Sequence, residues 1–269
     1  MNLMIIGERI NASRKPVKAA LSERNADFFK NEVSAQLKAG ANFIDLNAGR
    51  SPETELEDMN WLLDVVLAVS PTAKFSLDSA APAVLEAALK KINRPGQIIN
   101  SATLEPEKYE KLFPLMLKFQ AELIILLIDE NGAPSDADQR LARLSRLAKV
   151  LKENLIPLDR VWVDPLVFTL SANHCSAVHV LSTVREMKKR WPRLKTTCGL
   201  SNVSYGLPNR KLINRNFLVL LVEAGLDSFI LDPLDQSLMS SLYAATALAG
   251  RDESCLDYLT AFRQGKLKE

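Results

Sequence analysis

The chain has 269 residues, of which 47% are hydrophobic, so it is long and apolar enough to bury a large core. Its net charge of +2 excludes the strong basic field of most nucleic-acid-binding proteins, and its three cysteines predict no disulfide framework. The longest apolar run, Leu123–Ile128, is too short to span a membrane, and the N-terminus lacks the marks of a signal peptide, so we expect a cytoplasmic protein without membrane or nucleic-acid partners.

Short apolar runs typical of buried parallel strands alternate with helix-like segments along the whole chain. The predicted strands are Leu3–Ile6, Phe43–Asn47, Phe75–Asp78, Gln97–Asn100, Leu123–Ile128, Val161–Val163, Leu194–Cys198 and Ser228–Leu231. The predicted helices are Asp27–Ala39, Leu56–Val69, one opened by Pro82, one opened by Pro106, Asp136–Glu153, Ala177–Arg190, Leu212–Ala224 and Leu238–Ala249. Pro114 is expected to kink or split its helix, and the tail beyond Arg251 is expected to be a short helix or coil.

Eight strand–helix units follow one another without a linker. This count predicts an α/β protein with a single (β/α)8 TIM-barrel domain that spans residues 1–269. A doubly wound dinucleotide-binding sheet fits less well, because no G-x-G-x-x-G turn follows the first strand.

Some charged and reactive side chains are expected to lie outside any site. Arg140, Arg143 and Arg146 lie three residues apart on one predicted helix, and this spacing predicts a solvated face. His174 and His179 are the only histidines, and we expect them to have a core or surface role. We find no serine–histidine pairing and no cluster with zinc-ligand spacing, so we expect no bound metal.

Polar side chains recur where the predicted strands end. They are Glu8, Asn11, Asp45, Asn47, Asp78, Asn100, Asp129, Asp164, Asn202 and Asp232. One such residue is often only a helix cap, but in a barrel the carboxyl ends of all strands face the active site. A cavity lined by carboxylates and carboxamides suits a planar heterocycle with a donor–acceptor edge, such as a pterin.

Seven short segments carry a family resemblance that covers nearly the whole chain. They are Ile5–Asn11, Asp45–Asn47, Leu77–Ser79, Ile99–Ser101, Asp164–Leu166, Gly199–Ser204, and Asn209–Arg210 with Leu212–Arg215. On these segments the chain resembles methyltetrahydrofolate:corrinoid protein methyltransferases, and more distantly the folate domain of cobalamin-dependent methionine synthases. The family fold is a (β/α)8 barrel.

The resemblance implies a role for several of these side chains. Asp78, Asn100 and Asp164 are expected to hold the pterin edge, and the Asn202 amide is expected to reach N5, the atom that carries the methyl group. The predicted catalytic residues are Asn202, Asp164 and Ser201. The predicted substrate-binding residues are Asp78, Asn100, Asp164, Gly199, Ser201, Asn202, Glu8, Asn11, Asp45, Asn47 and Arg210.

The resemblance also implies the reaction and its partners. A methyl group is expected to pass between N5 of methyltetrahydrofolate and the cobalt of a corrinoid (cobalamin). The chain has no Asp-x-His-x-x-Gly cobalamin motif, so the corrinoid is expected on a separate protein, and the enzyme itself is expected to be a homodimer. The direction of transfer and the identity of that corrinoid protein stay open at this point.

Two other functions compete with methyl transfer. A pterin-condensing enzyme of the dihydropteroate synthase type shares the barrel, but it would show Lys-x-Ser-x-Arg near the last strand, where this chain has the acidic segment Leu231–Asp235. A non-catalytic folate carrier or corrinoid-docking module would share the pocket. It would show no methyl transfer whose rate depends on Asn202.

Overall fold

The computed structural model describes residues 3–268. In them, eight strands alternate with helices and form one sheet with the order β7-β6-β5-β4-β3-β2-β1-β8. The pairs β1–β2, β2–β3, β3–β4, β4–β5 and β6–β7 are all parallel. Eight strands that neighbour one another in chain order, separated by helices, make the predicted (β/α)8 barrel fold. By its internal contacts the chain divides into an N-terminal unit, Ile5–Ile125, and a C-terminal unit, which is the rest of the chain.

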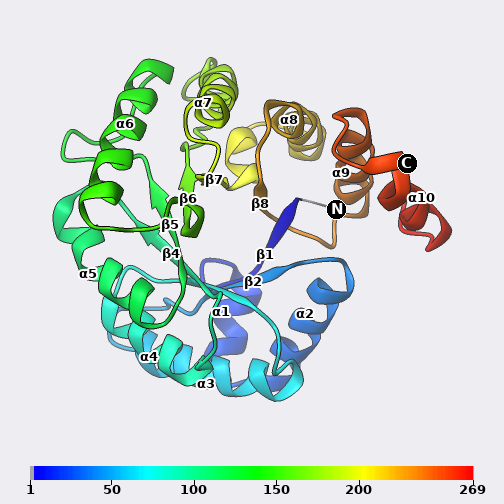
Figure 1. Cartoon of the computed structure of the whole chain (residues 1–269). Helices are drawn as coiled ribbons and strands as arrows, with labels where there is room; N and C mark the ends of the chain where they lie inside the picture. The colour runs from blue at the N-terminus through cyan, green and yellow to red at the C-terminus, as the bar shows by residue number, and fades with distance from the viewer. Residues whose placement is uncertain (1–2, 269) are drawn as a thin grey trace. The chain divides into compact units, whose positions relative to one another are not determined.

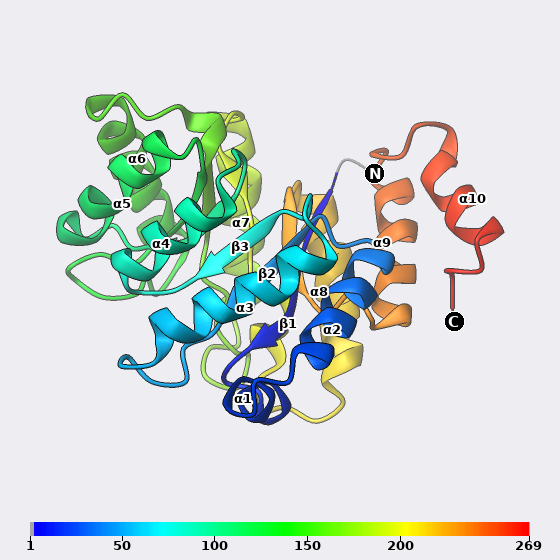
Figure 2. The same cartoon turned by 90° about the horizontal axis from the view of Figure 1, so that it is seen from below.

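The N-terminal unit contains the first strands of the sheet and the helices between them. Its strands are β1 (Met4–Asn11), β2 (Phe43–Asn47), β3 (Phe75–Asp78), β4 (Ile98–Ala102) and β5 (Glu122–Leu126). Its helices are α1 (Lys15–Ser22), α2 (Ala26–Lys38), α3 (Glu55–Val69), α4 (Pro82–Ile92) and α5 (Pro106–Lys118). Helices α2 to α5 pack against one another in chain order, as Figure 2 shows for α2, α3 and α4.

The register of this unit brings the polar strand ends to one edge. Asn11 pairs with Asn47, and Asp78 pairs with Asn100. Before these ends, the strands are apolar and fully buried, as at Ile44, Leu46 and Ile99. Burial on both faces makes a parallel strand a largely apolar run. Two polar residues, Asp45 in β2 and Ser76 in β3, are nevertheless buried before their strands end.

The C-terminal unit contains the remaining strands and helices. Its elements are α6 (Ala137–Glu153), η1 (Leu158–Arg160), β6 (Val161–Asp164), α7 (Ser176–Arg190), β7 (Lys195–Thr196), η2 (Leu200–Ser204), α8 (Arg210–Ala224), β8 (Ser228–Leu231), α9 (Gln236–Leu248), η3 (Glu253–Cys255) and α10 (Leu256–Arg263). Helices α6 to α9 pack in chain order, with α10 against α9 (Figure 1). Among residues 3–268, no helix combines the length and the apolarity needed to cross a membrane.

Several element bounds differ from the predicted ones. Helix α1 was not predicted; it begins with a proline in its first turn and buries Val17, Ala20 and Leu21. Helix α5 continues through Pro114 instead of splitting, because Phe113 and Met116 hold its apolar face in the core. Strand β7 has only two residues, and the chain then turns into η2.

Candidate active site

The strand ends of β2, β3 and β4 form a cluster of two carboxylates and two carboxamides, which we call the acidic cluster: Asp45, Asn47, Asp78 and Asn100. The Asn47 amide donates a hydrogen bond to Asp78, with 3.0 Å between Nδ2 and Oδ2. The Asn100 amide donates to Asp45, with 3.1 Å between Nδ2 and Oδ1. Asp78 is therefore oriented by an amide from the neighbouring strand β2, and Asp45 by an amide from β4, which lies beyond β3 in the sheet.

Burial changes the protonation of both carboxylates. It raises the pKa of Asp45 to about 8, and repulsion from Asp78 and Glu8 acts in the same direction, while the bond from Asn100 opposes it. Burial also raises the pKa of Asp78, helped by Glu55 and opposed by Asn47. Near neutral pH the Asp45 carboxyl group is therefore largely protonated, so the cluster offers both a hydrogen-bond donor and acceptors.

Replacing Asp45 with asparagine should change how stability depends on pH. The folded protein holds the Asp45 proton more tightly than the unfolded chain does, so this group lowers the free energy of unfolding as pH rises from about 4 to about 8. Asp45→Asn keeps the acceptor for Asn100 and should be more stable than the native protein at pH 8, by on the order of 1 kcal/mol or more.

Urea unfolding between pH 5 and 9 measures this difference. The matched control is Asp27→Asn on α2, because the Asp27 side chain is 85% exposed and should leave the pH slope almost unchanged. An Asp45→Asn variant with the native pH slope would contradict a buried, protonated Asp45.

Two other predicted residues of this unit, Glu8 and Asn11, belong to β1. Glu8 is half-buried and close enough to Asp45 to raise its pKa. Asn11 uses its side chain locally: its Oδ1 accepts a hydrogen bond from the Ser13 N–H, at 2.9 Å. Glu8 therefore adds to the negative potential of the acidic cluster, whereas Asn11 shapes the turn that follows β1.

In the C-terminal unit, Asp164 is the last residue of β6. Its Oδ1 accepts a hydrogen bond from the Leu166 N–H at 2.8 Å. Burial raises the pKa of Asp164 to about 6, opposed by this bond and by the positive charge of Arg140. Cys198 is fully buried, and burial together with Asp164 raises its thiol pKa well above the usual value, so Cys198 is a neutral core residue.

The turn η2 presents Ser201 and Asn202 from the same unit. Asn202 is exposed and Ser201 is half-buried. A Cβ atom at Gly199 would lie only 3.0 Å from Asn202 Nδ2, so the glycine leaves the space that this amide occupies. Ser204 is buried and donates to Asn214 Oδ1 at 2.7 Å, which anchors the end of the turn to α8.

Arg210 binds this turn from the start of α8. Its Nη2 donates to the Ser201 carbonyl at 2.8 Å and its Nε donates to Ser204 Oγ at 3.1 Å. Its guanidinium group also lies 5.7 Å from the centre of the Tyr205 ring. The bonds to η2 make Arg210 a support for Ser201 and Asn202, and its predicted contact with substrate stays a prediction.

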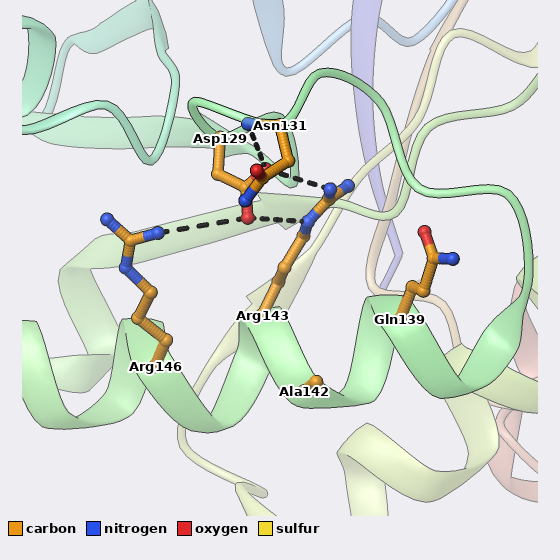
Figure 3. A pocket seen from close by; sticks show the side chains of 6 residues that line it. All are labelled: Asp129, Asn131, Gln139, Ala142, Arg143 and Arg146. Carbon is orange, nitrogen blue, oxygen red and sulfur yellow. Dashed lines mark hydrogen bonds and ion pairs between the residues drawn. The ribbon is translucent and has the colours of Figure 1, made fainter.

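The prediction of a solvated arginine face on α6 is wrong. Arg143 is nearly buried and pairs with Asp129 through two hydrogen bonds, Nε to Oδ2 at 2.9 Å and Nη2 to Oδ1 at 2.8 Å (Figure 3). Its Nη1 donates to the Leu127 carbonyl at 3.0 Å. Arg146 pairs with Glu130 at 2.7 Å. The physical reason is that the loop after β5 carries carboxylates and a carbonyl that these guanidinium groups satisfy.

Figure 3 shows the open pocket of about 490 Å³ beside these ion pairs, lined by Asp129, Asn131, Gln139, Ala142, Arg143 and Arg146. Asp129 was one of the polar strand ends found in the sequence. Because Arg143 neutralises it, Asp129 has a structural part in the loop, and the pocket has no unpaired carboxylate to offer a substrate.

Arg140 is the residue near the site that sequence reasoning missed. Its side chain is fully buried, and it donates three hydrogen bonds to carbonyls: Nε to Pro165 at 2.7 Å, Nη2 to Leu166 at 3.0 Å and Nη1 to Asp136 at 2.8 Å. Pro165 and Leu166 directly follow Asp164. Arg140 therefore holds the backbone on which one predicted pterin ligand lies.

Comparison with known proteins identifies the family to which the chain is similar. Residues 7–232 match the protein family described as pterin binding enzyme. The chain is 34% identical over 267 residues to a methylcorrinoid:tetrahydrofolate methyltransferase of Eubacterium limosum, covering 98% of both chains. It is 32% identical over 243 residues to a methionine synthase of Mycobacterium tuberculosis, and these residues are 85% of this chain but 20% of that protein.

Solved structures extend the likeness at the level of the fold. A dihydropteroate synthase from Xanthomonas albilineans, solved with 4-aminobenzoic acid, has a TM-score of 0.68 and covers 93% of this chain and 92% of its own. A dihydropteroate synthase from Coxiella burnetii, in complex with pteroic acid, has a TM-score of 0.66. The sequence identities of 14% and 16% restrict these two likenesses to the fold.

Proposed function

Because the chain belongs to the family of pterin-binding enzymes, we propose that it transfers a methyl group between the cobalt of a corrinoid on a separate protein and N5 of tetrahydrofolate. One observation carries this proposal: over 98% of both chains the protein is similar to an enzyme whose name states that reaction. That name puts the methylcorrinoid first, so we propose that the reaction forms methyltetrahydrofolate.

Asp78, Asn100 and Asp164 are proposed to bind the pterin edge. A pterin presents N–H donors on its amino-amidine side, and a carboxylate accepts such bonds strongly. Asn100 can donate and accept at neighbouring ring atoms. The raised pKa of Asp45 supports its part in the same recognition, because a protonated carboxyl group can donate to a ring oxygen or nitrogen.

Asn202 is proposed to assist the chemical step. N5 attacks the methyl carbon, the carbon–cobalt bond breaks, and its electron pair stays on cobalt. N5 then carries a positive charge until it loses its proton. The side-chain oxygen of Asn202 can accept a hydrogen bond from N5–H while this charge is present, which stabilises the transition state more than the neutral ground state. Asp164 or Ser201 is proposed to hold the water that takes the proton.

The end of β8 disfavours the pterin-condensing alternative. Such an enzyme must bind a diphosphate leaving group, yet Asp232 and Asp235 lie here as acceptors. Asp232 Oδ1 accepts from the Leu234 N–H at 2.9 Å, and Asp235 caps α9 by accepting from the Leu238 N–H at 3.1 Å. Two carboxylates would repel the diphosphate.

The remaining predictions concern the whole protein. We propose that residues 1–269 act as one pterin-binding domain, that the enzyme is cytoplasmic, and that it works as a homodimer without a corrinoid or metal of its own. The purified protein should be colourless and should show near twice the chain mass by light scattering. A stoichiometric corrinoid absorbance would contradict the separate carrier, and a monomer would contradict the homodimer.

A further inference from the structure

The turn after β6 has a conformation that leucine rarely adopts. Leu166 has a φ of +65°, in the left-handed region where a side chain is strained. In the same turn, the Leu166 N–H donates a hydrogen bond to Asp164 Oδ1, at 2.8 Å. The orientation of the carboxylate therefore depends on whatever holds the turn.

Arg140 holds this turn from α6. Two of its three hydrogen bonds end on the carbonyls of Pro165 and Leu166, at 2.7 and 3.0 Å, and the third ends on the Asp136 carbonyl at the start of its own helix. A guanidinium group is a rigid fork of donors, so it fixes the two carbonyls relative to the helix. Its centre also lies 5.6 Å from the centre of the Phe168 ring, on the same loop.

We infer that Arg140 is the positioning residue of the Asp164 carboxylate: it fixes the Pro165–Leu166 turn and thereby aims the carboxylate at the pterin. The inference rests on the proposed function, because it takes Asp164 as a pterin ligand. Arg140 makes no contact with the pterin in this account and acts through the backbone alone.

The charge of Arg140 acts in the same direction as its geometry. Burial raises the pKa of Asp164 to about 6, and both the Leu166 bond and Arg140 oppose this rise. The Cys198 thiol also interacts with Asp164, and it is neutral because its own pKa is raised. Removing Arg140 should therefore raise the pKa of Asp164 further and leave less carboxylate at neutral pH.

A double-mutant cycle with tetrahydrofolate tests the inference. Arg140→Met keeps an unbranched side chain but removes the charge and the donors, and it should weaken tetrahydrofolate binding roughly tenfold. In an Asp164→Ala background the same change should have no further effect, because Arg140 acts only through Asp164. If the double variant instead weakened tetrahydrofolate binding by the product of the two single-variant factors, the inference would be overturned.

A second measurement needs no ligand. The Asp164 carboxyl group, followed by carbon NMR in the ligand-free protein, should titrate at higher pH in Arg140→Met than in the native protein. Arg140→Lys restores the charge but not the fork, so its titration should lie between the two. An unchanged titration in Arg140→Met would overturn the inference. If Asp164→Ala bound tetrahydrofolate normally, the proposed function would fail instead, and the shifted titration would still support the link between Arg140 and Asp164.

Arg143→Met is the matched control for damage to the fold. Arg143 lies one turn further along α6, is nearly buried, and binds Asp129 and the Leu127 carbonyl instead of the turn after β6. This variant should lose at least as much thermal stability as Arg140→Met while the Asp164 titration stays at its native position. A shift of equal size in both variants would overturn the specific role of Arg140.

Discussion

Replacing Asp78 and Asp164 together with alanine should remove nearly all tight binding of tetrahydrofolate. Each carboxylate ends a strand and is held by a neighbour, Asp78 by Asn47 and Asp164 by Leu166, so each is fixed before substrate arrives. A lost charge-assisted hydrogen bond costs about 1.5–3 kcal/mol, or roughly ten- to over a hundredfold in affinity. The two losses together should reach roughly a hundred- to ten-thousandfold if they are independent.

Calorimetric titration of both single variants and the double variant with tetrahydrofolate and methyltetrahydrofolate measures this loss. Asp138→Ala is the control, because Asp138 is exposed in the first turn of α6 and should bind with native affinity. Native affinity should also weaken as pH falls below about 6, since Asp164 then takes up a proton. Unchanged dissociation constants in both single variants would remove these residues from the pterin site.

Replacing Asn202 with alanine should slow methyl transfer much more than it weakens binding. The hydrogen bond proposed for its amide becomes stronger as N5 gains positive charge, so it stabilises the transition state more than the ground state. A hydrogen bond to a charged group is worth about 1.5–3 kcal/mol, which corresponds to roughly ten- to over a hundredfold in rate. In the direction that consumes methyltetrahydrofolate, the rate should rise as pH falls, because N5 leaves in its protonated form.

Stopped-flow single turnover beside equilibrium binding separates rate from affinity. Gly199→Ala provides a graded comparison: its added Cβ would lie 3.0 Å from Asn202 Nδ2 and should displace the amide without removing it, so its rate should fall between the native and Asn202→Ala rates. An Asn202→Ala variant that loses binding but keeps its rate at saturation would make Asn202 a pterin anchor only.

The fold could be predicted from the sequence because each strand is a short apolar run that is easy to recognise. Apolar runs such as the one around Ile44 are buried, and the half-buried polar residue Asn47 is the last residue of this strand. The predicted gathering of polar side chains is confirmed within the N-terminal unit, where register pairs Asp78 with Asn100. The apolar pattern that marks a strand is local in the chain, which is why the strands can be predicted from the sequence.

The parts that the sequence did not reveal depend on distances between remote residues. Nothing in the sequence shows that burial, together with the nearby charge of Asp78, raises the pKa of Asp45 to about 8. Arg140 was predicted to lie on a solvated face because Arg140, Arg143 and Arg146 are spaced three residues apart on one helix. A signal was nevertheless present, since Arg140 and Arg143 continue the buried stripe of Leu144, Leu147 and Leu151 at helical spacing. A charged residue on an apolar stripe predicts a buried partner, here the carbonyls after β6.

The central claim is that this chain catalyses methyl transfer between a corrinoid protein and a folate. The most direct measurement mixes the enzyme with tetrahydrofolate and a methylated corrinoid protein and follows the corrinoid absorbance in a single turnover. We expect each methyl group lost from cobalt to appear as one methyltetrahydrofolate, and we expect Asn202→Ala to slow this transfer roughly ten- to over a hundredfold. A protein that binds tetrahydrofolate tightly while the methyl group stays on cobalt would contradict the account and would make the chain a folate-binding module.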